Sequence, residues 1–162
     1  MKNWKLSLSV VAVVAMAGQV HAAGNSASAT AKAKITVKKK IKIEKQTDLN
    51  FADAYTGDAQ DVVAPNDPNG RNAEFIVTGR EGAVFVVDLP GNNEVKMKTG
   101  AGNTPQTQIA VNGFTASTGG DGSTGVIEGE TTLTVGATRA AILEDQVEGA
   151  YEDVFTVGVS YQ

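Results

Sequence analysis

The chain has 162 residues, no cysteine and a single histidine, and its formal net charge at neutral pH is −4. The lack of cysteine excludes disulfides and thiol nucleophiles, and one histidine leaves almost no material for zinc or copper sites or for histidine-based acid–base catalysis. The length suits one domain with a core of ordinary size.

The first 22 residues have the pattern of a secretory signal peptide. Lys2 and Lys5 precede an apolar run, residues 6–17, and small residues follow it. We place the cleavage between Ala22 and Ala23, which also removes the histidine. The run is shorter than the roughly 18 apolar residues that a spanning helix needs, and no later stretch reaches that length. The sequence therefore predicts an exported protein with no transmembrane segment in the mature chain, periplasmic in transit and then at the cell surface or extracellular.

Charge is divided unevenly along the mature chain. Residues 23–45 carry seven lysines and one glutamate, a net charge of +6, whereas residues 46–162 carry five basic and 17 acidic residues, a net charge of −12. A basic arm on an acidic body can bind nucleic acid or a membrane surface, and it can equally favour head-to-tail contact between copies. Export, and the lack of aromatic residues in the arm, argue against nucleic acid.

The basic arm also alternates in hydropathy. Every second residue from Ala27 to Val37 is apolar, and the same parity resumes at Ile41 after the three lysines 38–40. A period of two is typical of an extended strand with one apolar face. It predicts either two strand segments joined by a bend near the lysines or a single long, half-buried first strand. The candidate donor-strand residues on this face are Ala29, Ala31, Ala33, Ile35, Val37, Ile41 and Ile43.

The rest of the chain predicts short strands between turns. We expect an N-terminal extension over residues 23–40 and one domain over residues 41–162. Within the domain the pattern predicts a long polar loop over 52–72, strands over 74–78, 83–89, 95–97, 107–116, 133–135 and 150–161, and a loop or single helical turn over 138–148. Short strands at regular spacing with Gly, Pro and Asn turns are typical of antiparallel sandwiches and barrels. The predicted fold class is all-β.

The C-terminal segment is the most specific part of the sequence. Its motif residues are Gly149, Tyr151, Phe155, Val157, Val159 and Tyr161. A glycine fourteenth from the end paired with a penultimate tyrosine resembles the C-terminal motif of chaperone–usher pilins. In those proteins a periplasmic chaperone reads the last strand, which borders a groove that another subunit's N-terminal arm fills. Tyr151 either forms a tyrosine corner, with its hydroxyl bonded back to nearby backbone, or packs in the core.

The resemblance extends beyond this motif. Leu49-Asn50-Phe51 and Val135-Gly136-Ala137-Thr138 look like a family of exported bacterial domains of unknown function (number four-four-zero-two), similar in style to spore coat protein U and fimbrial subunits. The sequence departs from that family at Ala52, where glycine is common, and at Arg139, where an apolar residue is common. The resemblance implies an immunoglobulin-like, pilin-like antiparallel β-sandwich in a fimbrium, with a part in cell adhesion. It implies related subunits, a periplasmic chaperone and an outer-membrane usher as partners.

Strand donation has a simple physical basis. An open sheet edge is a template for association, and an extended peptide with alternate apolar residues can complete it. Burying Ile35, Val37, Ile41 and Ile43 at roughly 1.5–3 kcal/mol each would contribute about 6–12 kcal/mol before costs. Insertion into a neighbour gives a fibre, because a head-to-tail contact that does not close propagates. Insertion into the same domain gives the alternative, a monomeric secreted or periplasmic binding module, or a surface protein, with its N-terminal strand in its own sheet.

The sequence offers few candidates for a catalytic or metal-binding site. Glu128 and Glu130 lie two apart, as a glycosidase pair on one strand face would, but we expect them to form a solvated acidic face. Asp67-Pro68-Asn69-Gly70 resembles the start of a calcium loop, yet the twelfth residue counted from Asp67 is Thr78 rather than glutamate. An ordinary Asn-Gly turn is expected there, with calcium binding left open. We therefore expect a non-catalytic protein with no cofactor and no metal site.

Overall fold

The computed structural model describes residues 27–100 and 102–162, so the predicted signal peptide and its cleavage site lie outside the described residues. The chain divides into two units, residues 1–35 and residues 36–162. Residues 27–35 of the first unit are exposed and belong to no strand or helix. The second unit contains every strand found among the described residues.

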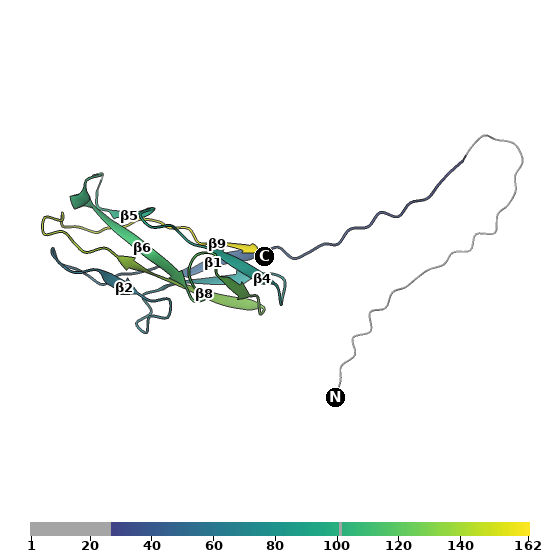
Figure 1. The fold of residues 1–162 in the computed structure, drawn as a ribbon, viewed down its shortest axis with the longest axis horizontal. Helices are drawn as coiled ribbons and strands as arrows, with labels where there is room; N and C mark the ends of the chain where they lie inside the picture. Colours follow the sequence, from purple (N-terminus) through teal and green to yellow (C-terminus); the bar gives the residue numbers. More distant parts are fainter. Residues whose placement is uncertain (1–26, 101) are drawn as a thin grey trace, which may run out of the picture. The chain divides into compact units, whose positions relative to one another are not determined.

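The second unit is built from short strands. In the described part of the chain these are β1 (Lys42–Thr47), β2 (Asp61–Val63), β3 (Ala73–Thr78), β4 (Val84–Asp88), β5 (Val95–Lys98), β6 (Gln108–Ala116), β7 (Thr124–Val126), β8 (Glu130–Arg139) and β9 (Gly158–Tyr161) (Figure 1). One 3-10 turn, η1 (Pro105–Thr107), precedes β6, and no α-helix occurs among the described residues. The predicted all-β class is confirmed.

The strands form two antiparallel sheets. The larger has the order β1-β3-β8-β6-β5, with β2 also paired to β8, and the smaller has the order β7-β4-β9. β8 is the organising strand because it pairs with β3, β6 and β2. β3 shows how sequence produces this arrangement, since buried and half-buried residues alternate along all six of its positions. This alternation places one apolar face of the strand on the core.

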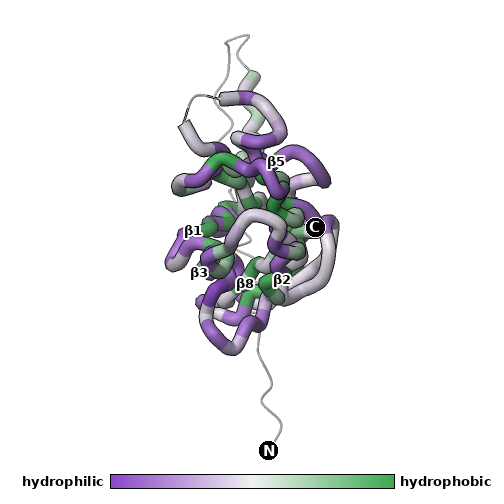
Figure 2. The backbone as a smooth tube through the Cα atoms, turned by 90° about the vertical axis from the view of Figure 1, so that its left-hand side faces the viewer, coloured by the Kyte–Doolittle hydropathy of each residue, from purple (hydrophilic) through white to green (hydrophobic). Residues whose placement is uncertain are grey.

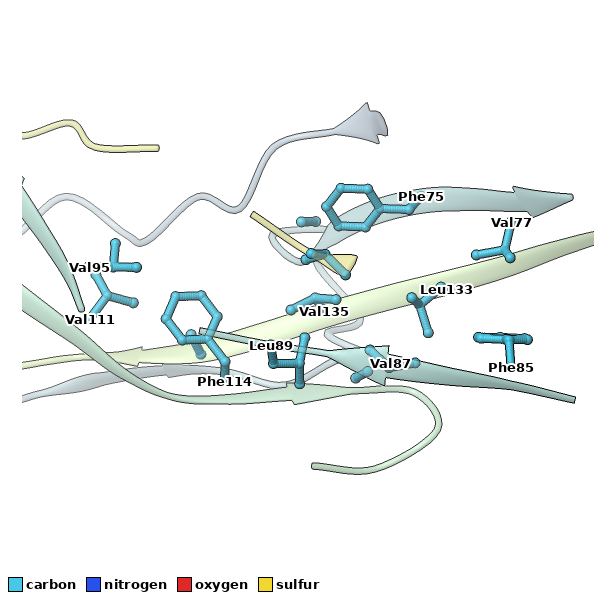
Figure 3. Close-up of a cluster of buried hydrophobic side chains, with 14 of the residues drawn as sticks. Phe75, Val77, Phe85, Val87, Leu89, Val95, Val111, Phe114, Leu133 and Val135 are labelled. Carbon is cyan, nitrogen blue, oxygen red and sulfur yellow. The ribbon is translucent and has the colours of Figure 1, made fainter. Parts of the chain in front are cut away.

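The two sheets share one hydrophobic core, as in a sandwich. Phe85 of β4, Val77 of β3 and Leu133 of β8 are fully buried and gather at one end of the cluster (Figure 3). Toward the other end, the rings of Phe114 and Phe155 lie 5.1 Å apart between centroids, tilted by 43°. The hydropathy of the backbone follows the same division, with apolar stretches inside and polar loops outside (Figure 2).

Four predicted strands, over 74–78, 83–89, 95–97 and 107–116, are present within one or two residues. β8 is longer at both ends than predicted, β7 was not predicted, and three further expectations were wrong. The predicted loop over 52–72 contains β2, whose three residues are too few to leave a sequence pattern. The predicted strand before the three lysines does not form, because residues 27–40 have no partner among the described residues and stay exposed. The last strand begins at Gly158 rather than near residue 150.

The late start of β9 has a physical cause. Residues 150–157 run extended from the larger sheet to the smaller one. Their backbone pairs with the larger sheet through a single bridge, in which the N–H and C=O groups of Glu152 and Lys98 bond to each other at 3.2 and 2.9 Å. The side chains of Phe155 and Val157 still pack on the core. The apolar alternation in this segment therefore reflects side-chain burial without a backbone ladder.

Candidate docking groove

The domain carries a groove with a volume of about 1210 Å³. One side is formed by residues 47–56, which begin at the end of β1, and the other side by residues 146–155, which precede β9. Phe75 of β3, Met97 of β5 and Ile109 of β6 contribute apolar lining. Phe75 and Ile109 are buried in the described chain and Met97 is half-buried, so the groove opens onto the edge of the hydrophobic core.

The groove exists because the two sheets differ in extent. The smaller sheet has three strands, and β9 is only four residues long. The chain that leads into β9 makes one bridge to β5 and no ladder. The part of the larger sheet near Phe75, Met97 and Ile109 consequently has no full strand laid over it.

β9 presents an unpaired edge. It pairs with β4 on one side, in the register Phe85 with Tyr161 and Val87 with Val159, and it stands last in its sheet. No other strand of the described chain pairs with its second side. Its residues, Gly-Val-Ser-Tyr, include neither a charged residue nor a proline, the usual protection of an exposed edge. Among the described residues, the second side of β9 therefore carries no backbone ladder, although β1 lies close to it.

The last motif residue, Tyr161, fixes the point where the extension joins the domain. Its hydroxyl donates a hydrogen bond to the carbonyl oxygen of Lys39 at 2.9 Å and accepts one from the backbone N–H of Arg80 at 2.8 Å. Gly79 makes room for this ring, since a Cβ there would lie 2.6 Å from the hydroxyl oxygen. The chain segment just before β1 is thereby tied to the end of β9.

A second tyrosine stiffens the groove side formed by residues 146–155. The hydroxyl oxygen of Tyr151 lies 2.6 Å from the carbonyl oxygen of Val147 and 2.9 Å from that of Gln106. The buried Gln146 side-chain amide donates to the Tyr151 hydroxyl at 3.0 Å and to the Gln106 carbonyl at 2.7 Å. The hydroxyl thus bonds back to backbone four residues earlier, as the tyrosine-corner interpretation expects, while the half-buried ring also packs.

Gly149 of the C-terminal motif is required by conformation as well as by space. Its φ of +148° is a value that side-chain-bearing residues rarely adopt, and a Cβ at this position would lie 2.6 Å from the Thr99 hydroxyl oxygen. It lets the chain turn into the groove side formed by residues 146–155.

The rim of the groove is acidic. Asp53, Glu148, Glu152 and Asp153 are exposed there, and none of the four is within salt-bridge distance of a basic group in the described chain. The groove is also lined by two basic residues and a fifth acidic residue. Lys45 is 2.6 Å from Asp48, so these two charges offset each other. Arg139 is buried and donates to backbone carbonyls.

The same rim exposes large apolar side chains. Tyr55 is 82% exposed and Val154 is 88% exposed, and both line the groove together with the partly exposed Val147. Such side chains around an apolar cleft are typical of an interaction surface. The groove therefore offers an apolar lining, an apolar and acidic rim, and β9 as a nearby open edge.

The structure separates the predicted donor residues into two groups. The five N-terminal ones are exposed and outside any strand, with Ile35 89% exposed and Val37 86% exposed. Ile41 and Ile43 instead pack partly buried against the domain's own core, and Ile43 pairs with Val77 of β3.

The predicted C-terminal motif is brought together with Ile41 and Ile43. Phe155, Val157 and Val159 contact the shared core, while Tyr161 lies at the surface. Sequence reasoning did not identify the groove lining or its acidic rim. The only available signal was the acidic excess of residues 46–162.

The remaining candidates from the sequence were a calcium loop at Asp67 and a carboxylate pair at Glu128 and Glu130. The backbone N–H of Asn69 bonds the Asp67 carboxylate at 2.7 Å, and Arg71 pairs with that carboxylate at 2.8 Å. Together they hold the pKa of Asp67 below its ordinary value. Glu128 and Glu130 are exposed. Within the described residues no group of three or more His, Cys, Asp or Glu side chains could hold a metal ion.

Comparison of the chain with family models, with curated proteins and with solved structures found no match. Among the described residues, no helix has the length and hydrophobicity needed to cross a membrane.

Proposed function

We propose that the protein is an exported, non-catalytic structural subunit of a bacterial surface fibre that assembles by β-strand donation. In this proposal the N-terminal extension of one copy lies in the groove of the next and adds a strand beside β9, within a pilin-like, immunoglobulin-like sandwich. The observation that carries it is the presence, in one chain, of an open groove with apolar residues in its lining and of an exposed extension with alternate apolar residues. Each is the complement of the other.

The energetics fit insertion of a short segment. Ile35 and Val37 expose almost their whole side chains, and burying these two would contribute about 3–6 kcal/mol before costs. This is half of the estimate from sequence alone, because Ile41 and Ile43 are already packed on their own domain. Main-chain hydrogen bonds along β9 would add to the affinity, and the alanines would fill shallower parts of the groove.

Insertion into a second copy is favoured over insertion into the same domain. Residues 38–40 link the exposed extension to β1, and the Tyr161 hydroxyl holds the carbonyl of Lys39 beside the end of β9. Those three residues are all lysine, with no Gly, Pro, Asn or Asp to form a tight turn, and their like charges repel each other.

The test is deletion of residues 23–37 from the mature protein. We expect the truncated protein to keep the β-rich circular-dichroism spectrum of a folded domain and to stay soluble with a chaperone. We expect no filaments by negative-stain microscopy, whereas the complete mature protein forms them. A truncated protein that still forms filaments would contradict strand donation.

One observation favours a second candidate function. β1 lies in the domain's own sheet, as expected of a monomeric secreted or periplasmic binding module. Size-exclusion chromatography of the complete mature protein separates the candidates. A monomer over the whole range of concentrations, with no filaments, would support the binding module.

A further inference from the structure

We infer that the acidic rim of the groove selects the lysine-bearing extension of a second copy, so that charge decides which strand is accepted. The inference rests on the proposed function and adds to it the identity of the partner. The observation behind it is that, in the described chain, the groove rim carries unpaired acidic residues and the extension carries exposed lysines.

The acceptor side carries carboxylates without partners. Asp53, Glu148 and Glu152 are exposed on the groove rim, outside every ion pair and side-chain hydrogen bond found in the described chain. Asp153 stands beside them, although its carboxylate also accepts the backbone N–H of Lys96 at 3.1 Å. The rim therefore has a local negative field above an apolar lining.

The donor side carries the opposite charge. Lys32, Lys34 and Lys38 alternate with the apolar residues and are exposed in the described chain. With the apolar face of the extension turned into the groove, these lysines lie on the opposite face, and their long flexible stems allow the ammonium groups to bend toward the rim. Lys39 and Lys40 add charge at the end of the extension.

Charge complementarity of this kind acts mainly on the rate and choice of association. Exposed ion pairs contribute little each at equilibrium. A complementary field, in contrast, raises association rates by about 10–1,000-fold and loses this effect as ionic strength increases. An acidic or uncharged strand would meet the same apolar lining without this attraction. The extension of a second copy is thus preferred over an unrelated peptide.

A charge-swap experiment tests the inference. The arm-reversed variant carries Lys32→Glu, Lys34→Glu and Lys38→Glu. The rim-reversed variant carries Asp53→Lys, Glu148→Lys and Glu152→Lys. We expect each variant alone to assemble at least about tenfold more slowly than the unaltered mature protein in low salt. An equimolar mixture should regain rapid assembly, since the acidic extension then fits the basic rim and the basic extension fits the acidic rim.

The matched control reverses three exposed carboxylates away from the groove, with Glu81→Lys, Glu128→Lys and Glu130→Lys. It changes the net charge as the rim reversal does, and we expect it to assemble at the unaltered rate. Thermal unfolding of each variant shows that the domain remains folded.

The outcomes distinguish the inference from the proposed function. If the unaltered protein assembles and both reversed variants assemble equally fast, or the mixture is no faster than its components, charge selection is wrong and strand donation stands. If the unaltered mature protein forms no filaments at any salt concentration, the proposed function fails and the inference with it. If the equimolar mixture assembles rapidly while each reversed variant by itself assembles slowly, and if added salt slows the mixture, the result supports both charge selection and strand donation.

Discussion

At the scale of single residues, Gly136 shows how closely two strands can approach. It lies within β8, and a Cβ there would clash with the carbonyl oxygen of Val63 and lie 2.6 Å from the carbonyl carbon of Ala64. Both are backbone atoms, so they cannot move aside as a flexible side chain would. β2 can pair with β8 and cross over it only because this position has no side chain.

We therefore expect Gly136→Ala to lower the free energy of unfolding by at least about 1–3 kcal/mol, the usual cost of overpacking a core. Urea unfolding followed by circular dichroism measures the change. Gly120→Ala is the matched control, since a Cβ at Gly120 meets nothing within 4 Å. Equal stability of the two variants would show that β2 does not lie against β8 in this way.

At the scale of elements, alternation in the sequence predicted burial better than it predicted pairing. β3, β4 and β6 were predicted because each turns one apolar face to the core. Residues 150–157 have the same pattern, yet their side chains pack while their backbone makes only one bridge. β2 was missed because it depends on a close backbone approach at Gly136, which no local pattern encodes.

The groove could not be predicted for a related reason. It results from the unequal extents of the two sheets, which depend on where ladders end rather than on the hydropathy of any one strand. The extension is the opposite case. Its alternation was visible in the sequence, but its described residues, 27–40, are all exposed. A pattern kept without burial in its own domain is what a donated strand would show.

This view of the extension predicts a difference between its two faces. The double variant Ile35→Asn and Val37→Asn should have a free energy of unfolding within about 0.5 kcal/mol of that of the unaltered protein, because both side chains are exposed. The same double variant should abolish filaments, because it places two amides on the apolar lining of the acceptor groove. Negative-stain microscopy and urea unfolding provide the two measurements.

The control for this variant is Thr36→Asn, which changes the residue between them on the opposite face of the extension. We expect it to assemble normally. If Thr36→Asn prevented filaments as effectively as the double variant, the extension would not insert with one face turned inward.

At the scale of the whole molecule, the donor and acceptor surfaces are distinct, which gives a proposed fibre a direction. The extension joins the domain beside Tyr161, before β1, whereas the groove is lined from the end of β1 onward. Under the proposed function, each copy would offer one donor segment, the extension, and one acceptor, the groove. A head-to-tail contact propagates into a fibre where its rotation does not close a ring.

A polar fibre can be terminated from one end. A copy without residues 23–37 keeps its groove and so accepts an extension, but it has none to donate. Small amounts mixed with the complete mature protein should shorten filaments in proportion to their share, as measured by length distributions in negative stain. The matched control lacks residues 23–37 and also carries Asp53→Lys, Glu148→Lys and Glu152→Lys. It cannot donate an extension and should accept one more slowly, so it should shorten filaments less than the first protein does. Equal shortening by both proteins would mean that termination does not pass through the groove, and the direction of the fibre would have to arise from another surface.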